Sequence, residues 1–260
     1  MNNKIRVICD TVIWYEIAKG KIDISNYNNY YFTATGVNIF ELSKTSNLIN
    51  NFNLYKNTLQ ALANFHDEII EYYPLEFILV YSSKINFKYD RQSLLETLVE
   101  FSFLLSCDFK ESDVVDNRKE KFIQTVKELN KPIDKFINDL NDYFSVAKEN
   151  LKKSKKDIRE LNKHKTKDIF INFMSLWFGD KVKMTKSDFN WTNIELISIV
   201  LREFFLENLL QRNKKIEYND LFDLLNLAYV RKGDKYWTKE KRWSRLIKLD
   251  EKVEHYLFTG

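Results

Sequence analysis

The stretch Arg6-Val-Ile-Cys-Asp10-Thr11, close to the start of the chain, decides the fold class. Its apolar and β-branched residues form a short run that ends in an acid, which is typical of a buried strand. Residues 11–19 follow with apolar side chains at helical spacing, and Gly20 ends this predicted helix. The chain is therefore expected to open with a strand that leads directly into a helix.

Strand candidates lie at both ends of the chain, with helical patterns between them. The second strand is predicted at 29–34 and the last at 235–238, where aromatic and β-branched residues cluster. The helical segments are expected at 36–48, 54–71, 74–81, 91–105, 120–161 (interrupted or kinked near Pro132), 192–212 after the capping box Thr192 to Glu195, and from Asp220 with Asn219 as its cap and Gly233 at its end.

This order of elements predicts an α/β sandwich whose mostly parallel central sheet is built from the two termini. The parts of the sheet domain are expected at 1–84 and 191–260, with a large helical insertion or cap at 85–190. The 260 residues, with 44% hydrophobic content and 39 aromatic side chains, can build a substantial core. The low content of turn residues, with only five glycines and two prolines in the chain, argues against an all-β protein rich in tight turns.

Composition also excludes several classes of protein. Two cysteines cannot form a disulfide framework, and no apolar stretch approaches the roughly 18 uncharged residues needed to cross a bilayer. A soluble, cytoplasmic protein without a membrane partner is therefore expected. The chain contains no glycine-rich phosphate loop and no recognisable nucleophile signature, which argues against nucleotide-cradling folds and serine or cysteine hydrolases.

Acidic residues are placed where open α/β sheets bind ligands. Asp10 follows the first predicted strand, and Glu240 follows the last. Glu41 lies on a predicted helix, while Asp220 and Asp223 share one helix face. Carboxylates that converge repel one another unless a cation lies between them, and oxygen ligands suit Mg²⁺ or Mn²⁺. Each of these acids taken alone is also explained by a helix cap or a solvated face.

Four short motifs in this order resemble the PIN domain family of metal-dependent nucleases. They are Val7-Ile-Cys-Asp10-Thr11, Asn38-Ile-Phe-Glu41-Leu, Asn219-Asp-Leu-Phe-Asp223-Leu-Leu and Trp237-Thr-Lys-Glu240-Lys. The resemblance covers about residues 1–50 and 215–245. It departs from the family at Glu240, where an Asp is typical, and in the central helices, which the compact family members lack.

The resemblance implies a PIN-like three-layer sandwich and a nuclease that hydrolyses phosphodiester bonds, with RNA favoured over DNA. By this similarity Asp10, Glu41, Asp223 and Glu240 would hold Mg²⁺ or Mn²⁺, with Asp220 as an additional or alternative ligand. Thr11 and Thr238 would orient the site. The alternative is a non-catalytic PIN-like or helical module that binds nucleic acid or protein. A protein partner or a homo-oligomer stays open.

Positive charge is concentrated in the segment 148–168, which carries nine basic and four acidic side chains although the whole chain is only +4. Its lysines Lys152, Lys153, Lys155 and Lys156 fit either a solvated helix face or an arm that contacts phosphates. Near the last strand, Lys239 and Arg242 are further candidates for phosphate contacts. Trp237 is expected in the core, whereas Trp243 is the better candidate for stacking on bases.

Overall fold

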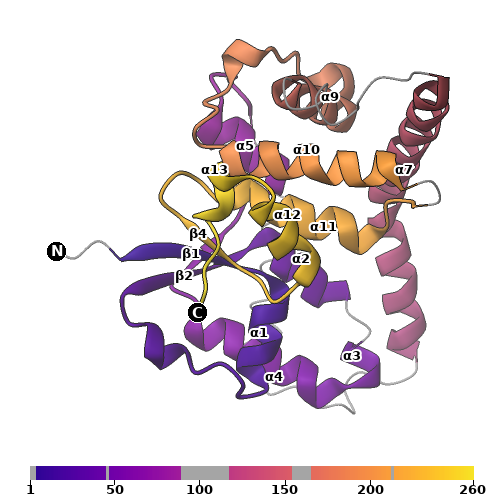
Figure 1. Ribbon diagram of the computed structural model, residues 1–260. Helices are drawn as coiled ribbons and strands as arrows, with labels where there is room; N and C mark the ends of the chain where they lie inside the picture. Colours follow the sequence, from indigo (N-terminus) through magenta and orange to yellow (C-terminus); the bar gives the residue numbers. More distant parts are fainter. Residues whose placement is uncertain (1–3, 45–46, 89–116, 154–164, 212–213) are drawn as a thin grey trace.

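The computed structural model describes residues 4–44, 47–88, 117–153, 165–211 and 214–260. Its centre is a four-stranded sheet in the order β3-β2-β1-β4, in which every pair of neighbours is parallel. Figure 1 shows β4, β1 and β2 of this sheet. The strands are β1 (Ile5–Cys9), β2 (Tyr30–Thr35), β3 (Glu68–Ile70) and β4 (Lys235–Trp237). The prediction of an α/β protein with a parallel sheet drawn from both termini is therefore confirmed.

The register of the strands brings their carboxyl ends to one edge. Ile8 pairs with Thr33 of β2, and Cys9 pairs with Trp237 of β4. The residues that come directly after these strands consequently meet at the same side of the sheet, where parallel α/β sheets place ligands.

Helices account for most of the remaining described residues. The α-helices are α1 (Thr11–Ala18), α2 (Gly36–Lys44), α3 (Asn47–Asn50), α4 (Phe52–Phe65), α5 (Pro74–Ser82), α7 (Asn117–Lys153), α9 (Thr166–Phe178), α10 (Glu195–Leu210), α11 (Tyr218–Asn226), α12 (Lys241–Lys248) and α13 (Glu251–Glu254). Short 3₁₀ helices are η1 (Ile24–Tyr27), η3 (Gly179–Lys181), η4 (Lys186–Asp188) and η5 (Leu227–Tyr229).

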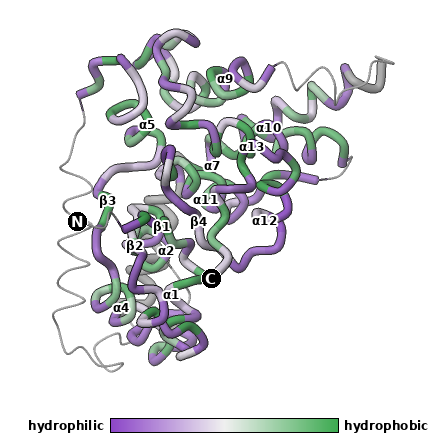
Figure 2. The backbone as a smooth tube through the Cα atoms, turned by 60° about the vertical axis from the view of Figure 1, so that its left-hand side comes forward, coloured by the Kyte–Doolittle hydropathy of each residue, from purple (hydrophilic) through white to green (hydrophobic). Residues whose placement is uncertain are grey.

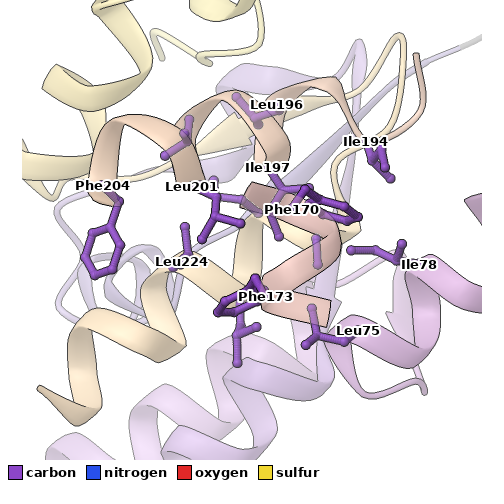
Figure 3. Packing of buried hydrophobic residues seen from close by; sticks show 14 of the residues in the cluster. Leu75, Ile78, Phe170, Phe173, Ile194, Leu196, Ile197, Leu201, Phe204 and Leu224 are labelled. Atoms are coloured by element: carbon purple, nitrogen blue, oxygen red, sulfur yellow. The ribbon is translucent and has the colours of Figure 1, made fainter. Parts of the chain in front are cut away.

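The alternation of side chains along β1 divides the core into two clusters, one on each face of the sheet. Val7 and Cys9 pack with α1 and α4 in the smaller cluster. Ile8 points to the other face, where the larger cluster joins the sheet to α5, α7, α9, α10 and α11. Figure 3 shows part of this larger cluster, with Phe170 and Phe173 of α9 against Leu201 of α10.

Helix α10 is apolar on most of its surface because other helices surround it. Its residues from Leu196 to Leu206 are buried, with Glu203 as the exception, and α7, α9, α11 and α12 all contact the helix. The helices from the middle of the chain thus share one core with the sheet. The division into 1–84, 85–190 and 191–260 stays a prediction.

Several predicted boundaries are wrong for local reasons. The helix expected at 54–71 ends at Phe65, and β3 follows it as a strand too short to show alternation. Helix α10 begins at Glu195 and not at Thr192, so the expected capping box does not form. Helix α11 begins at Tyr218, because Glu217 and Asp220 form its capping box in place of Asn219. It ends at Asn226, where η5 continues the chain, and not at Gly233.

Two further predictions concern the middle of the chain. Helix α7 runs without interruption through Pro132 and is described as far as Lys153. The helix expected at 91–105 lies outside the described residues. The apolar run behind Pro74 is helical, as predicted, and Pro74 occupies the first turn of α5.

The outer side of β4 is covered by the end of the chain. The backbone N–H of Tyr236 donates to the carbonyl of Tyr256 at 2.7 Å, and that of Phe258 donates to the carbonyl of Tyr236 at 2.9 Å. Tyr236 therefore pairs with Ile8 of β1 on one side and with Leu257 on the other.

None of the helices in the described part of the chain combines the length and apolar character needed to span a lipid bilayer.

Candidate carboxylate site

Four acidic residues come from four separate elements at the carboxyl edge of the sheet. Asp10 follows β1 and is the N-cap of α1, while Glu240 follows β4 and precedes α12. Glu41 lies on α2 and Asp223 lies on α11. Electrostatic interactions connect Asp10 with Glu41, Asp223 and Glu240. We call these four carboxyl groups the acid centre.

Asp10 is held by two hydrogen bonds in a buried position. Its Oδ1 accepts from the backbone N–H of Thr11 at 2.7 Å, and its Oδ2 accepts from the Thr238 hydroxyl at 2.6 Å. The residue is 3% exposed, and this burial raises its pKa to about 6, against the two hydrogen bonds and with a smaller contribution from Glu240. Asp10 therefore has a fixed orientation and an uncompensated charge.

Glu41 is oriented by a chain of donors that begins at Asn38. The Asn38 Nδ2 donates to the Thr11 hydroxyl at 2.9 Å, and that hydroxyl donates to Glu41 Oε2. Burial raises the pKa of Glu41 to about 8, and the charges of Asp10 and Asp223 act in the same direction. Thr11 thus contacts two acids, Asp10 through its backbone and Glu41 through its side chain.

The start of α2 fixes Asn38 and Glu41 together. Thr35 and Asn38 exchange hydrogen bonds, with the Thr35 N–H donating to Asn38 Oδ1 at 2.9 Å and the Asn38 N–H donating to Thr35 Oγ1 at 3.3 Å. This is the reciprocal pattern of a capping box. Glu41 lies three residues later on the same helix face as Asn38, so the cap at the end of β2 sets the position of both side chains.

Asp223 is oriented from the other side of the acid centre. Its Oδ2 accepts from the indole N–H of Trp243 at 2.8 Å. Burial raises its pKa to about 7, with further contributions from Asp10, Glu240 and Asp220. Phe40 of α2 stacks on Phe222 of α11 at 4.9 Å between ring centroids, which holds the helices that carry Glu41 and Asp223 together.

The remaining two acids differ from these three. Glu240 is exposed, and its backbone N–H donates to the Thr238 hydroxyl at 2.9 Å. Asp220 forms an ion pair with Arg242 and caps the start of α11, where it accepts from the Glu217 N–H at 3.3 Å. Asp220 therefore faces a cation, and its predicted role as a further ligand is the least supported of the five.

Two buried polar residues that the sequence did not single out lie beside the acid centre. Asn226 is fully buried and joins two strands, because its Oδ1 accepts from Thr35 Oγ1 at 2.8 Å and its Nδ2 donates to the Cys9 carbonyl at 3.4 Å. The Tyr236 hydroxyl is also buried and lies close to the side chains of Asp10 and Asn226. Asp10 and Asp223 lie close enough to raise the pKa of Tyr236, after burial itself.

The chemistry of this donor set fits a hard divalent cation. Its donors are carboxylate oxygens, and no lysine or arginine of the described residues forms an ion pair with the four acids of the centre. As these side chains stand, however, the described part of the chain contains no group of three or more His, Cys, Asp or Glu side chains that could hold a metal ion.

The basic candidates have different placements. Lys152 and Lys153 end α7, whereas Lys155 and Lys156 lie outside the described residues. Arg242 pairs with Asp220 and Glu207. Lys239 is exposed and lies beside the site, directly before Glu240.

The two tryptophans near the last strand are both core residues. Trp243 is 1% exposed and stacks on Phe204, which corrects the expectation that it stacks on bases. Trp237 is buried as predicted.

No protein-family model, no curated protein and no solved structure matches this chain.

Proposed function

We propose that the chain is a metal-dependent nuclease that hydrolyses phosphodiester bonds at the acid centre, with Mg²⁺ or Mn²⁺ as its ion and RNA favoured over DNA. The observation that carries this proposal is the convergence of Asp10, Glu41 and Asp223, none of which forms an ion pair with a lysine or arginine of the described residues. Burying carboxylates together costs free energy, so their retention at a sheet edge is a reason to expect a cationic ligand. The resemblance of the surrounding motifs to PIN domains agrees with this assignment.

The chain's own residues would orient the reacting groups. Asp10, Glu41, Asp223 and Glu240 would hold the ion, which would supply Lewis-acid activation of water and stabilise the leaving oxygen. Thr238 and the Thr11 N–H fix Asp10, while Asn38 acts through Thr11 on Glu41. The raised pKa values of Glu41 and Asp223 belong to the protein without an ion, and a bound divalent cation would favour the ionised form of both carboxyl groups.

A non-catalytic PIN-like module is the second candidate. One observation favours it: both oxygens of Asp10 already accept hydrogen bonds from the protein, as an acid that only caps a helix would. Each carboxylate oxygen has a second lone pair, so these bonds do not exclude a ligand. The two candidates differ in whether the protein cleaves nucleic acid.

The test is cleavage of labelled single-stranded RNA and DNA in the presence of Mn²⁺, comparing the parent with Asp10→Asn. Asparagine also caps helices well, so this variant should fold. We expect cleavage by the parent and only background with Asp10→Asn. Asp180→Asn, an exposed change of the same kind in η3, should keep full activity. Equal cleavage by the parent and Asp10→Asn would refute the proposed role of the acid centre.

A second readout does not depend on activity. A metal ion that binds only the folded state stabilises it by about 2.7 kcal/mol at one hundred times its Kd. Mn²⁺ should therefore raise the melting temperature of the parent and of Asp180→Asn, and should have little effect on Asp10→Asn. A parent that neither cleaves nor responds to Mn²⁺ would favour the non-catalytic module.

A further inference from the structure

A groove with a basic lining runs along α12 next to the acid centre. It has a volume of about 550 Å³ and is lined mainly by Thr238, Lys239, Lys241, Ser244, Arg245 and Lys248. We call it the basic groove. Figure 2 shows α12 as a strongly hydrophilic stretch at the outside of the molecule, beside β4.

The basic side chains of the groove share one helix face. Lys241, Arg245 and Lys248 are spaced four and three residues apart, so they lie on the same side of α12, and Lys239 precedes them. At a rise of about 1.5 Å per residue, the row from Lys241 to Lys248 extends over roughly 10 Å. Among the described residues, no acidic side chain lines the groove.

Nearby acids leave most of this charge uncompensated. Glu207 pairs with Arg245 at 3.0 Å, and the Arg245 side chain remains 52% exposed. Glu240 lies between Lys239 and Lys241 in the sequence, but its charge acts on Asp10 and Asp223. In the part of the chain that the structure describes, Lys239, Lys241 and Lys248 are exposed and form no ion pair.

One residue connects the basic groove to the acid centre. Thr238 lines the groove, and its hydroxyl donates to Asp10 at 2.6 Å. A polyanion that lies along α12 would therefore have one end next to Thr238 and Asp10. The other face of the same helix is fixed, because Trp243, Leu246 and Ile247 are buried in the core.

We propose that the basic groove binds the phosphate backbone of a single-stranded nucleic acid and guides it to the acid centre. This inference rests on the proposed nuclease function, and it names the surface that its substrate follows. Successive phosphates of one strand are about 3.4 Å apart along a duplex axis and farther apart in an extended single strand, so a row of roughly 10 Å contacts about two or three phosphates. Lysines supply point charge, and the contacts would position a strand without reading its sequence.

The test is binding of labelled twelve-residue RNA and DNA oligonucleotides in EDTA, where no metal-dependent cleavage occurs. The variant Lys241→Glu/Lys248→Glu changes two exposed groove lysines, and Lys181→Glu/Lys183→Glu makes the same change in net charge at exposed positions after α9. We expect the groove variant to lose about tenfold or more in affinity, and the salt slope to fall by about 1.4 for two lost phosphates. The control should bind as the parent does.

Each other outcome has a defined meaning. Equal losses in both double variants, or no binding by the parent, would overturn the groove proposal. Polyglutamate that competes as well as the oligonucleotides would also overturn it and would indicate an acidic protein partner. A preference for RNA or for DNA identifies the source of the phosphates. Groove-dependent binding without any cleavage in Mn²⁺ would refute the nuclease and leave the groove assigned.

Discussion

Two regions of the molecule contain buried ionisable side chains, but only one of them pairs these side chains with opposite charges. At the acid centre three carboxyl groups are buried or half-buried without a cation, and burial raises their pKa values to about 6, 8 and 7 for Asp10, Glu41 and Asp223. At Arg202 one buried guanidinium lies between two carboxylates, at 2.5 Å from Glu203 and 3.0 Å from Asp250. Although burial opposes it, the hydrogen bond from Arg202 keeps the pKa of Asp250 below its usual value.

The two regions differ in whether the buried charge has an opposite charge beside it within the protein. The Arg202 group joins α10 to Asp250, the cap of α13, and also donates to Thr166 at the start of α9 at 3.2 Å. Its charges are compensated inside the protein. The acid centre has hydrogen-bond donors, but none of its four acids forms an ion pair among the described residues, which agrees with the proposed cation site.

The largest effect should come from removing the cation of the compensated region. Arg202→Met leaves Glu203 and Asp250 partly buried without their partner, which should reduce the free energy of unfolding by about 3 kcal/mol. Arg202→Lys keeps the charge but not the forked geometry, and should lose less. Urea unfolding of both variants measures the difference. Equal stability of parent and Arg202→Met would show that this region does not depend on compensation.

A smaller effect should appear as a pH dependence of the metal-free protein. The folded-state pKa values of Asp10, Glu41 and Asp223 are raised above the usual values of 3.8 and 4.5, so the folded form retains protons that the unfolded chain has released. Their contribution is complete below about pH 4 and is lost as the pH rises towards about 8. We expect the stability in EDTA to fall by about 2 kcal/mol between about pH 6.5 and pH 8, where the folded form still retains the proton of Glu41 and one retained proton contributes about 1.4 kcal/mol per pH unit.

The control for this pH dependence is Asp10→Asn in EDTA, whose stability should change less over the same range because one of the three interacting charges is absent. Chemical unfolding at about pH 5, 6.5 and 8 measures both proteins. A parent that becomes more stable as the pH rises through this range would contradict uncompensated burial of these acids.

The smallest effect should come from the donor that orients Asp10. Thr238→Val removes the hydroxyl that donates to Asp10, which should cost about 1 kcal/mol at about pH 8, when the carboxylate is charged. Thr238→Ser keeps the hydroxyl and should stay close to the parent. The same comparison in Mn²⁺ should show weaker metal stabilisation for Thr238→Val. Identical behaviour of the valine and serine variants would remove Thr238 from the orienting network.

Sequence signals within short segments were sufficient to predict the strands and the helix that carry or precede the site residues. Asp10 after a strand of apolar residues, and the last strand before Thr238, follow from the β-branched and aromatic residues of short segments and from the signals at their ends. The helix that carries Glu41 follows from its periodicity. The parallel sheet follows from strands at both ends of the chain, separated by helices.

The remaining features depend on contacts between distant segments. Asn226 joins α11 to the ends of β1 and β2, and Trp243 contacts Asp223 twenty residues away, so neither role has a local signal. The start of α11 depends on which of two neighbouring side chains caps it, and Glu217 takes that position instead of Asn219. Three residues of β3 are too few to reveal a period.

The pairing of Tyr236 with the end of the chain has a consequence for self-association. An open strand edge offers unpaired N–H and carbonyl groups to strands of other molecules, and it is a common starting point for aggregation. At Tyr236 both backbone groups on the outer side are already bonded, to Tyr256 and Phe258. The sheet is therefore terminated at this position, and a second molecule cannot extend it through Tyr236 without first displacing residues 256–258.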